Sequence, residues 1–331
     1  MPSGLLIRLR PAGPWRIGPD SGDRDRVDRI YHSDSLYSAV TSAMARLGTL
    51  DEWIAATASS PEPAVRFSSC FPYHGDTLLV VPPRNLWPPP PSSKIRWKGA
   101  RFVPLSVVET LASGRPLAED GWMIDGPSEC LLPFSTPAAP GPFRVTVRSS
   151  AGVDREGAGV SPHSTACLEF TPGSGLWCAV QFSDEAARDK WTAPLTAAFR
   201  LLADSGFGGK RSQGWGRTEM PEITEGLVEV RTGSDEDRGY WLLSLFHPGA
   251  SDAVDWTQGN YSLTTRGGRI ESDARWGDAK KQTRMVSEGS VLVASTEPRG
   301  AVTDVAPDGF AHPVYRSGFA LAISVPLRSA K

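Results

Sequence analysis

A glycine-rich, basic segment between Gly206 and Arg217 has the residue types of a phosphate-binding loop. It reads GFGGKRSQGWGR, so five of its twelve residues are glycine and three are basic. Glycine adopts positive φ angles and has no Cβ to hold a ligand away, and such a loop can direct several backbone N–H groups at one phosphate. Lys210 and Arg211 would add charge, and Trp215 a face for stacking on a base. The combination favours a clamp for a nucleic-acid backbone over the alternative, a flexible surface turn.

The segment differs from the two common nucleotide-binding motifs. A P-loop has a glycine five positions before the glycine that precedes its lysine, and Asp204 occupies that position here. A dinucleotide fingerprint opens a helix after a strand, whereas this loop follows a predicted helix. We therefore expect no bound ATP or NAD, and no other cofactor.

Length and composition predict an ordinary soluble protein with two modest domains. The chain has 331 residues, of which 40% are hydrophobic and 22% are charged, and a domain usually takes roughly 100–200 residues. No stretch approaches the ~18 consecutive apolar residues of a membrane helix. The apolar run near the N-terminus is too short for a signal peptide. We expect a cytoplasmic protein with no membrane partner.

The cysteines do not indicate a metal site or a disulfide framework. None of the four belongs to a C-x-x-C pair, and no histidine lies at zinc-finger spacing from two of them. We expect them to act as small hydrophobic residues, and we expect no bound metal.

The net charge of −2 argues against binding nucleic acid by bulk attraction, since domains that do so usually have a pI above ~9. An RNA site on this chain must therefore be a local patch with acidic surfaces elsewhere. Such a distribution of charge suits a subunit that binds RNA on one face and protein on another.

The first predicted elements are a strand over residues 4–10 and an amphipathic helix that ends near Leu47. Ser33 or Asp34 would cap the helix, because either side chain can accept a free N–H of the first turn. Gly48 then fits the position at which the helix stops.

A second strand and helix lead into the glycine-rich loop. Residues 176–182 favour a strand, and Asp184 would cap the helix that follows and ends at Gly206. A proline inside a helix is costly, so we expect this helix to restart at Pro194. Residues 227–231 favour a further strand. Strand, helix, strands, helix and strand form the split β-α-β-β-α-β arrangement of ferredoxin-like domains.

Proline is dense between residues 60 and 165, which disfavours central strands and helix interiors there. We expect long inserted loops and a protruding hairpin, with residues 143–148 as a basic-edged strand. Trp97 lies between two basic residues and is a candidate for contact with RNA or a partner. The first domain, with this insertion, would cover residues 1–231.

The rest of the chain predicts a second, strand-rich unit. Residues 232–239 are charged and would form a linker to a domain over residues 240–331. Short strand patterns with little helix indicate a degenerate ferredoxin-like fold, whose basic spots lie at residues 266–270 and 280–284. The predicted fold class is α+β, with tandem ferredoxin-like (RRM-like) domains of which the first carries long proline-rich insertions.

Taken in order, short segments along most of the chain resemble the RAMP superfamily of CRISPR effector proteins. Within it, the chain resembles the subunit-four family of the type III-A Csm complex, although Ser35 stands where that family commonly has threonine. A glycine-rich loop after the last helix of a ferredoxin-like domain is typical of the superfamily. The matching segments are YHSDSLYSA (31–39), FPY (71–73), FVP (102–104), VDR (153–155), the glycine-rich loop, YSLTTRGGR (261–269), EGS (288–290) and HPVYRSGFA (312–320).

The resemblance implies a non-catalytic subunit that binds the repeat-derived 5′ tag of the crRNA. The family docks against the large polymerase-like subunit and the first backbone RAMP subunit of the complex. The inserted residues 85–165 would fold over the guide or touch the backbone subunit. The residues expected to bind RNA are His32, Gly208, Gly209, Lys210, Arg211, Ser212, Gln213, Gly214, Trp215, Gly216, Arg217, Arg266, Lys280 and Lys281.

The residues leave two other functions open. His32 could be the general acid or base of a metal-independent crRNA endonuclease, since histidine can exchange a proton with a 2′-hydroxyl; it could also have a structural role beside the helix cap. A scaffold without RNA contact is favoured by the acidic net charge and opposed by the glycine-rich loop. Asp34 has no carboxylate neighbour at useful spacing, so we interpret it as a cap rather than a metal ligand.

Overall fold

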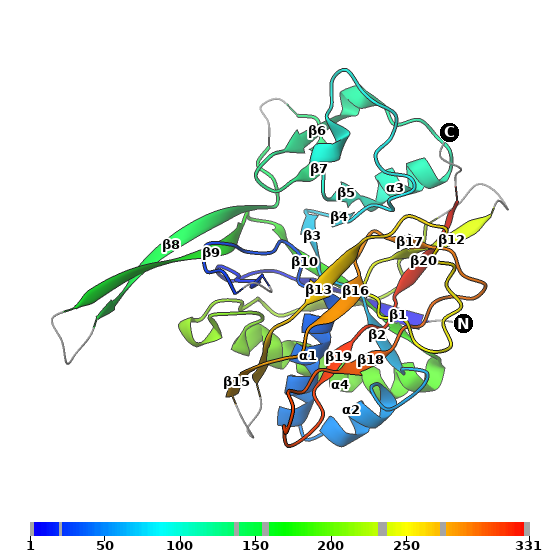
Figure 1. The fold of residues 1–331 in the computed structure, drawn as a ribbon. Coiled ribbons are helices and arrows are strands. Elements are labelled where there is room, and N and C mark those ends of the chain that lie inside the picture. The colour runs from blue at the N-terminus through cyan, green and yellow to red at the C-terminus, as the bar shows by residue number, and fades with distance from the viewer. Residues whose placement is uncertain are drawn as a thin grey trace.

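The computed structural model describes residues 3–19, 22–135, 139–153, 159–230, 237–271 and 276–327. This part of the chain is mixed α+β, as expected, with helices gathered in the first unit and strands throughout (Figure 1).

One antiparallel sheet organises the first unit. Its strand order is β11, β1, β10 and then the pair β2 and β3, with helices α1, α2 and α4 packed against it (Figure 1). Along the chain these elements follow one another as strand, helix, strands, helix and strand, the predicted connectivity. Their bounds are β1 Ser3–Leu9, α1 Ser33–Arg46, α2 Leu50–Ala56, β2 Val65–Phe67, β3 Phe71–His74, β10 Ser174–Phe182, α4 Glu185–Ser205 and β11 Glu222–Glu225.

Helix α1 begins and ends close to the predicted positions, but the prediction of its cap is wrong. His32 is the N-cap residue and its side chain makes no capping hydrogen bond; the N–H of Ser33 donates instead to the hydroxyl of Ser69, at 2.8 Å. The hydroxyl of Ser33 instead accepts the N–H of Leu245, at 3.0 Å, and Asp34 binds arginines of the second unit. The side chains of Ser33 and Asp34 therefore bind residues that are distant in sequence and do not cap the helix. Gly48 follows the last turn with a φ of 77°, as expected.

Helix α4 is capped as predicted, because Asp184 Oδ1 accepts the N–H of Ala187 at 2.7 Å. The predicted restart at Pro194 is wrong, since the helix runs through this proline. Buried Trp191 and Leu195 flank Pro194 and anchor the helix to the core, which offsets one missing hydrogen bond. The strand predicted at residues 227–231 is also wrong: β11 lies earlier.

The inserted region holds more regular structure than its prolines predicted. Strands β2 and β3 belong to the main sheet, and β4 and β5 extend it. Trp97 packs edge-on against Trp87 and is 4% exposed, so its interpretation as a surface contact is wrong. The remaining elements are β4 Thr77–Val80, the 3-10 turn Trp97–Gly99, β5 Val103–Pro104, α3 Leu105–Ala112, the 3-10 turn Glu119–Gly121, β6 Trp122–Asp125 and β7 Cys130–Pro133.

The protruding hairpin is confirmed. Strands β8 (Phe143–Val153) and β9 (Val160–Phe170) pair over their whole length and project far from the body of the molecule (Figure 1). Its base is anchored by buried Phe143 and by Trp15, which pairs with Leu168. Farther out, Val147 is 58% exposed. The predicted Asp154–Arg155 element lies outside the described residues.

The second unit is strand-rich, as predicted, and contains no helix within residues 237–271 and 276–327. Arg238 already belongs to a strand, so the linker predicted to reach residue 239 ends earlier; residues 232–236 lie outside the described part. A three-stranded sheet, in the order β17, β12, β20, is joined by three two-stranded ribbons. The strands are β12 Arg238–Leu242, β13 Leu263–Arg266, β14 Arg269–Glu271, β15 Trp276–Ala279, β16 Thr283–Val286, β17 Val291–Leu292, β18 Val302–Asp304, β19 Tyr315–Ser317 and β20 Ala322–Pro326.

The two units share one hydrophobic core. The main cluster of buried side chains contains Trp53 and Trp177 from the first unit together with Trp241 and Phe319 from the second. The indole N–H of Trp241 also donates to the carbonyl of Val81, at 3.1 Å. Neither unit can therefore bury its apolar surface alone.

Replacing Trp241 by alanine should cost about 3–5 kcal/mol, the usual loss for a large aromatic residue in a core. Urea unfolding followed by circular dichroism and by fluorescence should still give one coincident transition. Trp256→Ala is the matched control, because Trp256 is 40% exposed and should cost far less. Two separate transitions in the wild-type chain would contradict the shared core.

Candidate nucleic-acid interface

An open groove of about 640 Å³ lies where the two units meet. The first turns of α1 form one wall, and the start of the glycine-rich loop forms another. The third wall comes from the second unit, at the ends of β13 and β19 and the turn after β15. The groove therefore brings together segments that the sequence singled out separately.

Close backbone contacts hold the glycine-rich loop in place. Gly208 has a φ of 71° and lies against the carbonyl of Arg16, which accepts the N–H of Gly209 at 2.8 Å. Gly216, with a φ of 78°, leaves no room for a Cβ beside the backbone of Phe207. The ring of Phe207 is buried and stacks on Trp15, at 5.3 Å between centroids. This packing disfavours the alternative of a loose surface turn.

Most of the loop's amides already have partners. The N–H groups of seven residues donate to backbone carbonyls, so fewer amides are available to bind a phosphate than the glycines predicted. Lys210 has a φ of 63°, an uncommon conformation for a residue with a side chain. Because most amides of the loop are already used, attraction of a phosphate must come mainly from charged side chains. The seven residues whose N–H groups are used are Gly206, Phe207, Gly209, Gln213, Gly214, Trp215 and Gly216.

Helix α1 turns a face of small residues toward the groove. Ser35, Ser38, Ala39 and Ser42 recur at helical spacing and line the wall, whereas Leu36 is buried in the core. Such short side chains let a ligand approach the helix closely.

Asp34 lies at the floor of the groove and is 6% exposed. Its carboxylate accepts from Arg266, at 3.1 Å from Nε and 3.0 Å from Nη2, and from Nη1 of Arg316 at 2.8 Å. Burial disfavours the charged carboxylate, but the two guanidinium groups outweigh it and hold the pKa of Asp34 well below its usual range. The site is thus an ionised carboxylate shared by two arginines.

The described lining of the groove is strongly basic. Asp34 is its one carboxylate, against five basic side chains. A chain with a net charge of −2 therefore concentrates positive charge in this hollow. The basic residues are Arg211, Arg266, Arg269, Lys280 and Arg316.

His32 belongs to a separate buried cluster and does not line the groove. Its Nδ1 lies 2.7 Å from Glu288 Oε1 and its Nε2 lies 3.1 Å from Asp28 Oδ2, while Ser69 donates to Glu288. Burial opposes the imidazolium, but Glu288 and Asp28 raise the pKa of His32 to about 9. A protonated ring that lies outside the groove and donates both N–H groups to carboxylates has no free proton acceptor and no donor left for RNA. The geometry therefore disfavours both the RNA-contact and the endonuclease interpretations of His32.

The groove gathers about a third of the residues predicted to bind RNA and adds two arginines. Lys281 pairs with Asp308 at 2.7 Å, away from the groove. Arg269 belongs to a basic spot that the sequence had indicated, and Arg316 lies in the family-like segment 312–320. The predicted residues that line the groove are Gly208, Gly209, Arg211, Arg266 and Lys280. Those that do not are His32, Lys210, Ser212, Gln213, Gly214, Trp215, Gly216, Arg217 and Lys281.

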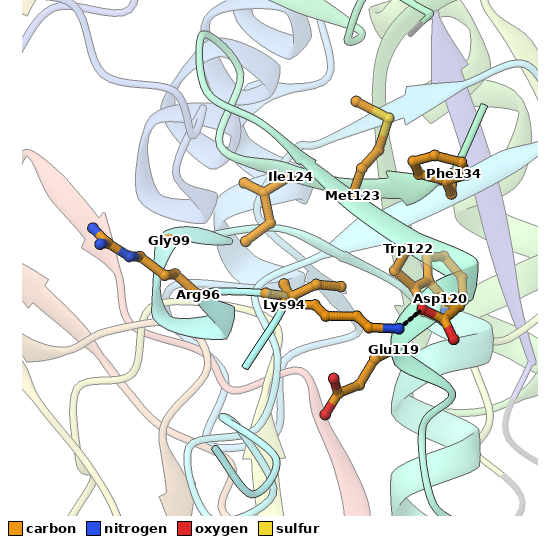
Figure 2. Close-up of a pocket in the computed structure, with 10 residues that line it drawn as sticks. Lys94, Arg96, Gly99, Glu119, Asp120, Trp122, Met123, Ile124 and Phe134 are labelled. Carbon is orange, nitrogen blue, oxygen red and sulfur yellow. Dashed lines mark hydrogen bonds and ion pairs between the residues drawn. The ribbon is translucent and has the colours of Figure 1, made fainter. Parts of the chain in front are cut away.

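Figure 2 shows a second pocket, of about 600 Å³, in the inserted region. Its charges balance, because Lys94 and Arg96 line it together with Glu119 and Asp120. Lys94 forms an ion pair with Asp120 (Figure 2). The rest of its lining is mainly apolar and includes Trp122, Met123, Ile124 and Phe134. Without an excess of positive charge, it is a weaker candidate for nucleic acid than the groove.

The described residues offer neither a metal site nor a membrane-spanning helix. No three or more His, Cys, Asp or Glu side chains in this part of the chain gather as a metal ion requires. None of its helices is long and apolar enough to span a membrane.

Comparison with known proteins gives consistent matches. Residues 235–325 match the family model described as the CRISPR Csm4 C-terminal domain. The chain is 24% identical over 335 residues to "CRISPR system Cms protein Csm4" of Thermococcus onnurineus (strain NA1), covering 99% of this chain and 98% of the relative.

Two solved structures share the fold. A chain in the crystal structure of a Csm3-Csm4 subcomplex of the type III-A CRISPR-Cas interference complex has a TM-score of 0.63 at 16% identity, covering 98% of this chain and all of that one. A chain in the Csm1-Csm4 cassette in complex with cA4 has a TM-score of 0.61 at 18% identity, covering 99% and 100%.

The His32 cluster predicts that stability decreases toward alkaline pH. The pKa of His32 rises from 6.5 to about 9 on folding, so its contribution is complete below pH 6.5 and is lost as the pH rises through 9. Urea unfolding across that window should show the decline. His32→Gln should remove it and cost about 3–5 kcal/mol at neutral pH, as when one partner of a buried ion pair is lost. The exposed His312→Gln is the control, and an unchanged pH profile in His32→Gln would contradict the assignment.

Proposed function

Because the chain belongs to the Csm4 family of the type III-A CRISPR Csm complex, we propose that it is a non-catalytic RNA-binding subunit whose groove holds the repeat-derived 5′ tag of crRNA. One observation carries the proposal: five basic side chains and a single carboxylate meet in a groove of an otherwise acidic chain. Such a groove can follow a phosphate backbone.

The residues that line the groove suit RNA. Glycines line two walls of the groove, so a ligand can come close to the backbone there. They are Gly208 and Gly209 on one wall and Gly267 and Gly268 on the other. The serine hydroxyls of α1 can pair with phosphate or 2′-hydroxyl groups, and the 2′-hydroxyl distinguishes RNA from DNA. The ring of Tyr315 also lines the groove and offers a face for a base.

We also propose the family's partners and fold for this chain. The relatives with known structure are found in complexes named for Csm1 and for Csm3, which supports docking against a large polymerase-like subunit and a backbone RAMP subunit. The connectivity of the first unit supports a ferredoxin-like domain, and the strand-rich second unit fits a degenerate copy of it.

The inserted region would extend along the guide. The hairpin of β8 and β9 projects from the side of the molecule that carries the glycine-rich loop, because Trp15 contacts both the hairpin base and Phe207. Exposed Val145 and Val147 lie on one face of the hairpin, while Arg144 and Arg148 bind Glu169 on the other. This apolar face suits contact with bases or with the neighbouring subunit.

Catalysis is not part of the proposal. The one histidine that the sequence offered as a general acid or base is buried between two carboxylates. The groove itself holds arginines, a lysine and one carboxylate with a lowered pKa, which bind charge but are poorly suited to transferring protons near neutral pH.

Arg211→Ala combined with Lys280→Ala should weaken binding of crRNA a hundredfold or more, because each of the two lost charge-assisted contacts is worth about 1.5–3 kcal/mol. The slope of log affinity against log salt should become shallower by about 1.4, or ~0.7 per phosphate contact on a single strand. Fluorescence anisotropy at several salt concentrations measures both quantities.

Lys210→Ala combined with Lys281→Ala is the matched control. It removes two positive charges from residues adjacent in sequence to the first pair, but neither side chain lines the groove. Full RNA binding by the groove variant would overturn the proposal. Equal loss in both variants would indicate bulk charge rather than the groove.

Replacing residues 149–163 by a short glycine–serine turn should leave the tag bound while exposing guide nucleotides to nuclease. The base of the hairpin, with Phe143 and Phe170, stays intact in this variant. Footprinting of crRNA in the assembled complex measures the change, and a variant in which only residues 154–158 are replaced is the control. An unchanged footprint in the longer replacement would contradict the role of the hairpin.

A further inference from the structure

We infer that Asp34 is a positioning residue for RNA: its buried carboxylate fixes the orientation of Arg266 and Arg316 and limits their combined charge. The groove would then select RNA by the placement of two guanidinium groups rather than by bulk attraction. This inference rests on the proposed RNA-binding function and adds to it a residue that does not itself bind the ligand.

The geometry around Asp34 leaves the two arginines little freedom. Arg266 makes a two-point contact with the carboxylate, and its Nη2 also lies 3.1 Å from the hydroxyl of Ser35. Arg316 donates from Nη1 to Asp34 and from Nη2 to the carbonyl of Gly267, at 2.5 Å. A guanidinium group is planar, so two such contacts fix its plane as well as its position. Both arginines line the groove in this fixed orientation.

The charge of the cluster also depends on Asp34. Two guanidinium groups and one carboxylate leave a single positive charge on side chains whose exposure is 7% or less. Without the carboxylate, two like charges would be buried together, which is strongly unfavourable. We expect the freed arginines to turn outward to water and to offer phosphates more charge with less order.

The neighbouring ionic cluster provides the comparison that separates positioning from general stabilisation. Glu288 is also a buried carboxylate that joins α1 to the second unit, through His32. It does not line the groove. Glu288→Gln and Asp34→Asn therefore remove the same charge from the same junction, but only the second removes a direct contact of the groove arginines.

The test compares full-length wild type, Asp34→Asn and Glu288→Gln in two measurements. Phenylglyoxal labelling followed by mass spectrometry reports the accessibility of Arg266 and Arg316 without RNA. Anisotropy reports the affinities for a synthetic RNA that carries the repeat-derived 5′ tag and for a scrambled RNA of the same length and composition. Thermal unfolding of each variant shows how much stability is lost.

Asp34→Asn should increase labelling of both arginines and reduce the preference for the tag about tenfold, the size expected when one charge-assisted hydrogen bond is lost. Its salt slope should steepen by about 0.7 for each added phosphate contact. Glu288→Gln should lose stability with labelling and preference unchanged. Equal labelling in wild type and Asp34→Asn would overturn the positioning role, as would equal loss of preference in both variants. Failure of wild type to bind either RNA, with the labelling difference present, would instead contradict the proposed function.

Discussion

The groove depends on how the first turn of α1 meets the second unit. Within three residues, that turn carries an imidazolium held by two carboxylates and a carboxylate held by two guanidinium groups. Buried ion pairs of this kind add little net stability, because desolvation offsets most of their attraction. Their value here is positional. They set the register between α1 and the strands β13 and β19, and that register decides where the groove lies.

Local charge matters more than net charge in this molecule. At physiological salt the screening length is about 8 Å, so exposed acidic residues on distant surfaces scarcely weaken the potential inside the groove. Asp34 is close enough to weaken the potential in the groove, but its carboxylate is paired with Arg266 and Arg316. The shared core keeps both halves of the groove in place, since Trp241 and Phe319 pack with the tryptophans of the first unit. A basic site can therefore exist on a chain whose overall charge is negative.

Local patterns in the sequence predicted much of the fold but only part of the site. Helix α1, the cap of α4, the strand β10 and the hairpin each follow from neighbouring residues, and the glycine-rich loop was found from its composition alone. The pairing of Asp34 with Arg316 joins residues 282 positions apart, and no local pattern encodes it. Trp97 was misinterpreted because flanking basic residues suggested exposure, whereas its burial depends on Trp87. The predicted restart at Pro194 was wrong because packing of the neighbouring side chains into the core outweighs the one backbone hydrogen bond that a proline removes.

The long separation within the two ionic clusters has a bearing on how the chain is made. His32 leaves the ribosome 256 residues before Glu288, and Asp34 precedes Arg316 by 282. Throughout that interval the nascent first unit lacks the partners for its charged turn and the tryptophan that completes its core. Folding that depends on such distant contacts is slow. Until these contacts form, the chain exposes apolar surface through which it can aggregate. Residues as late as Arg316 thus complete the first turn of α1, and a chain released before they are synthesised lacks the partners that fix its first unit.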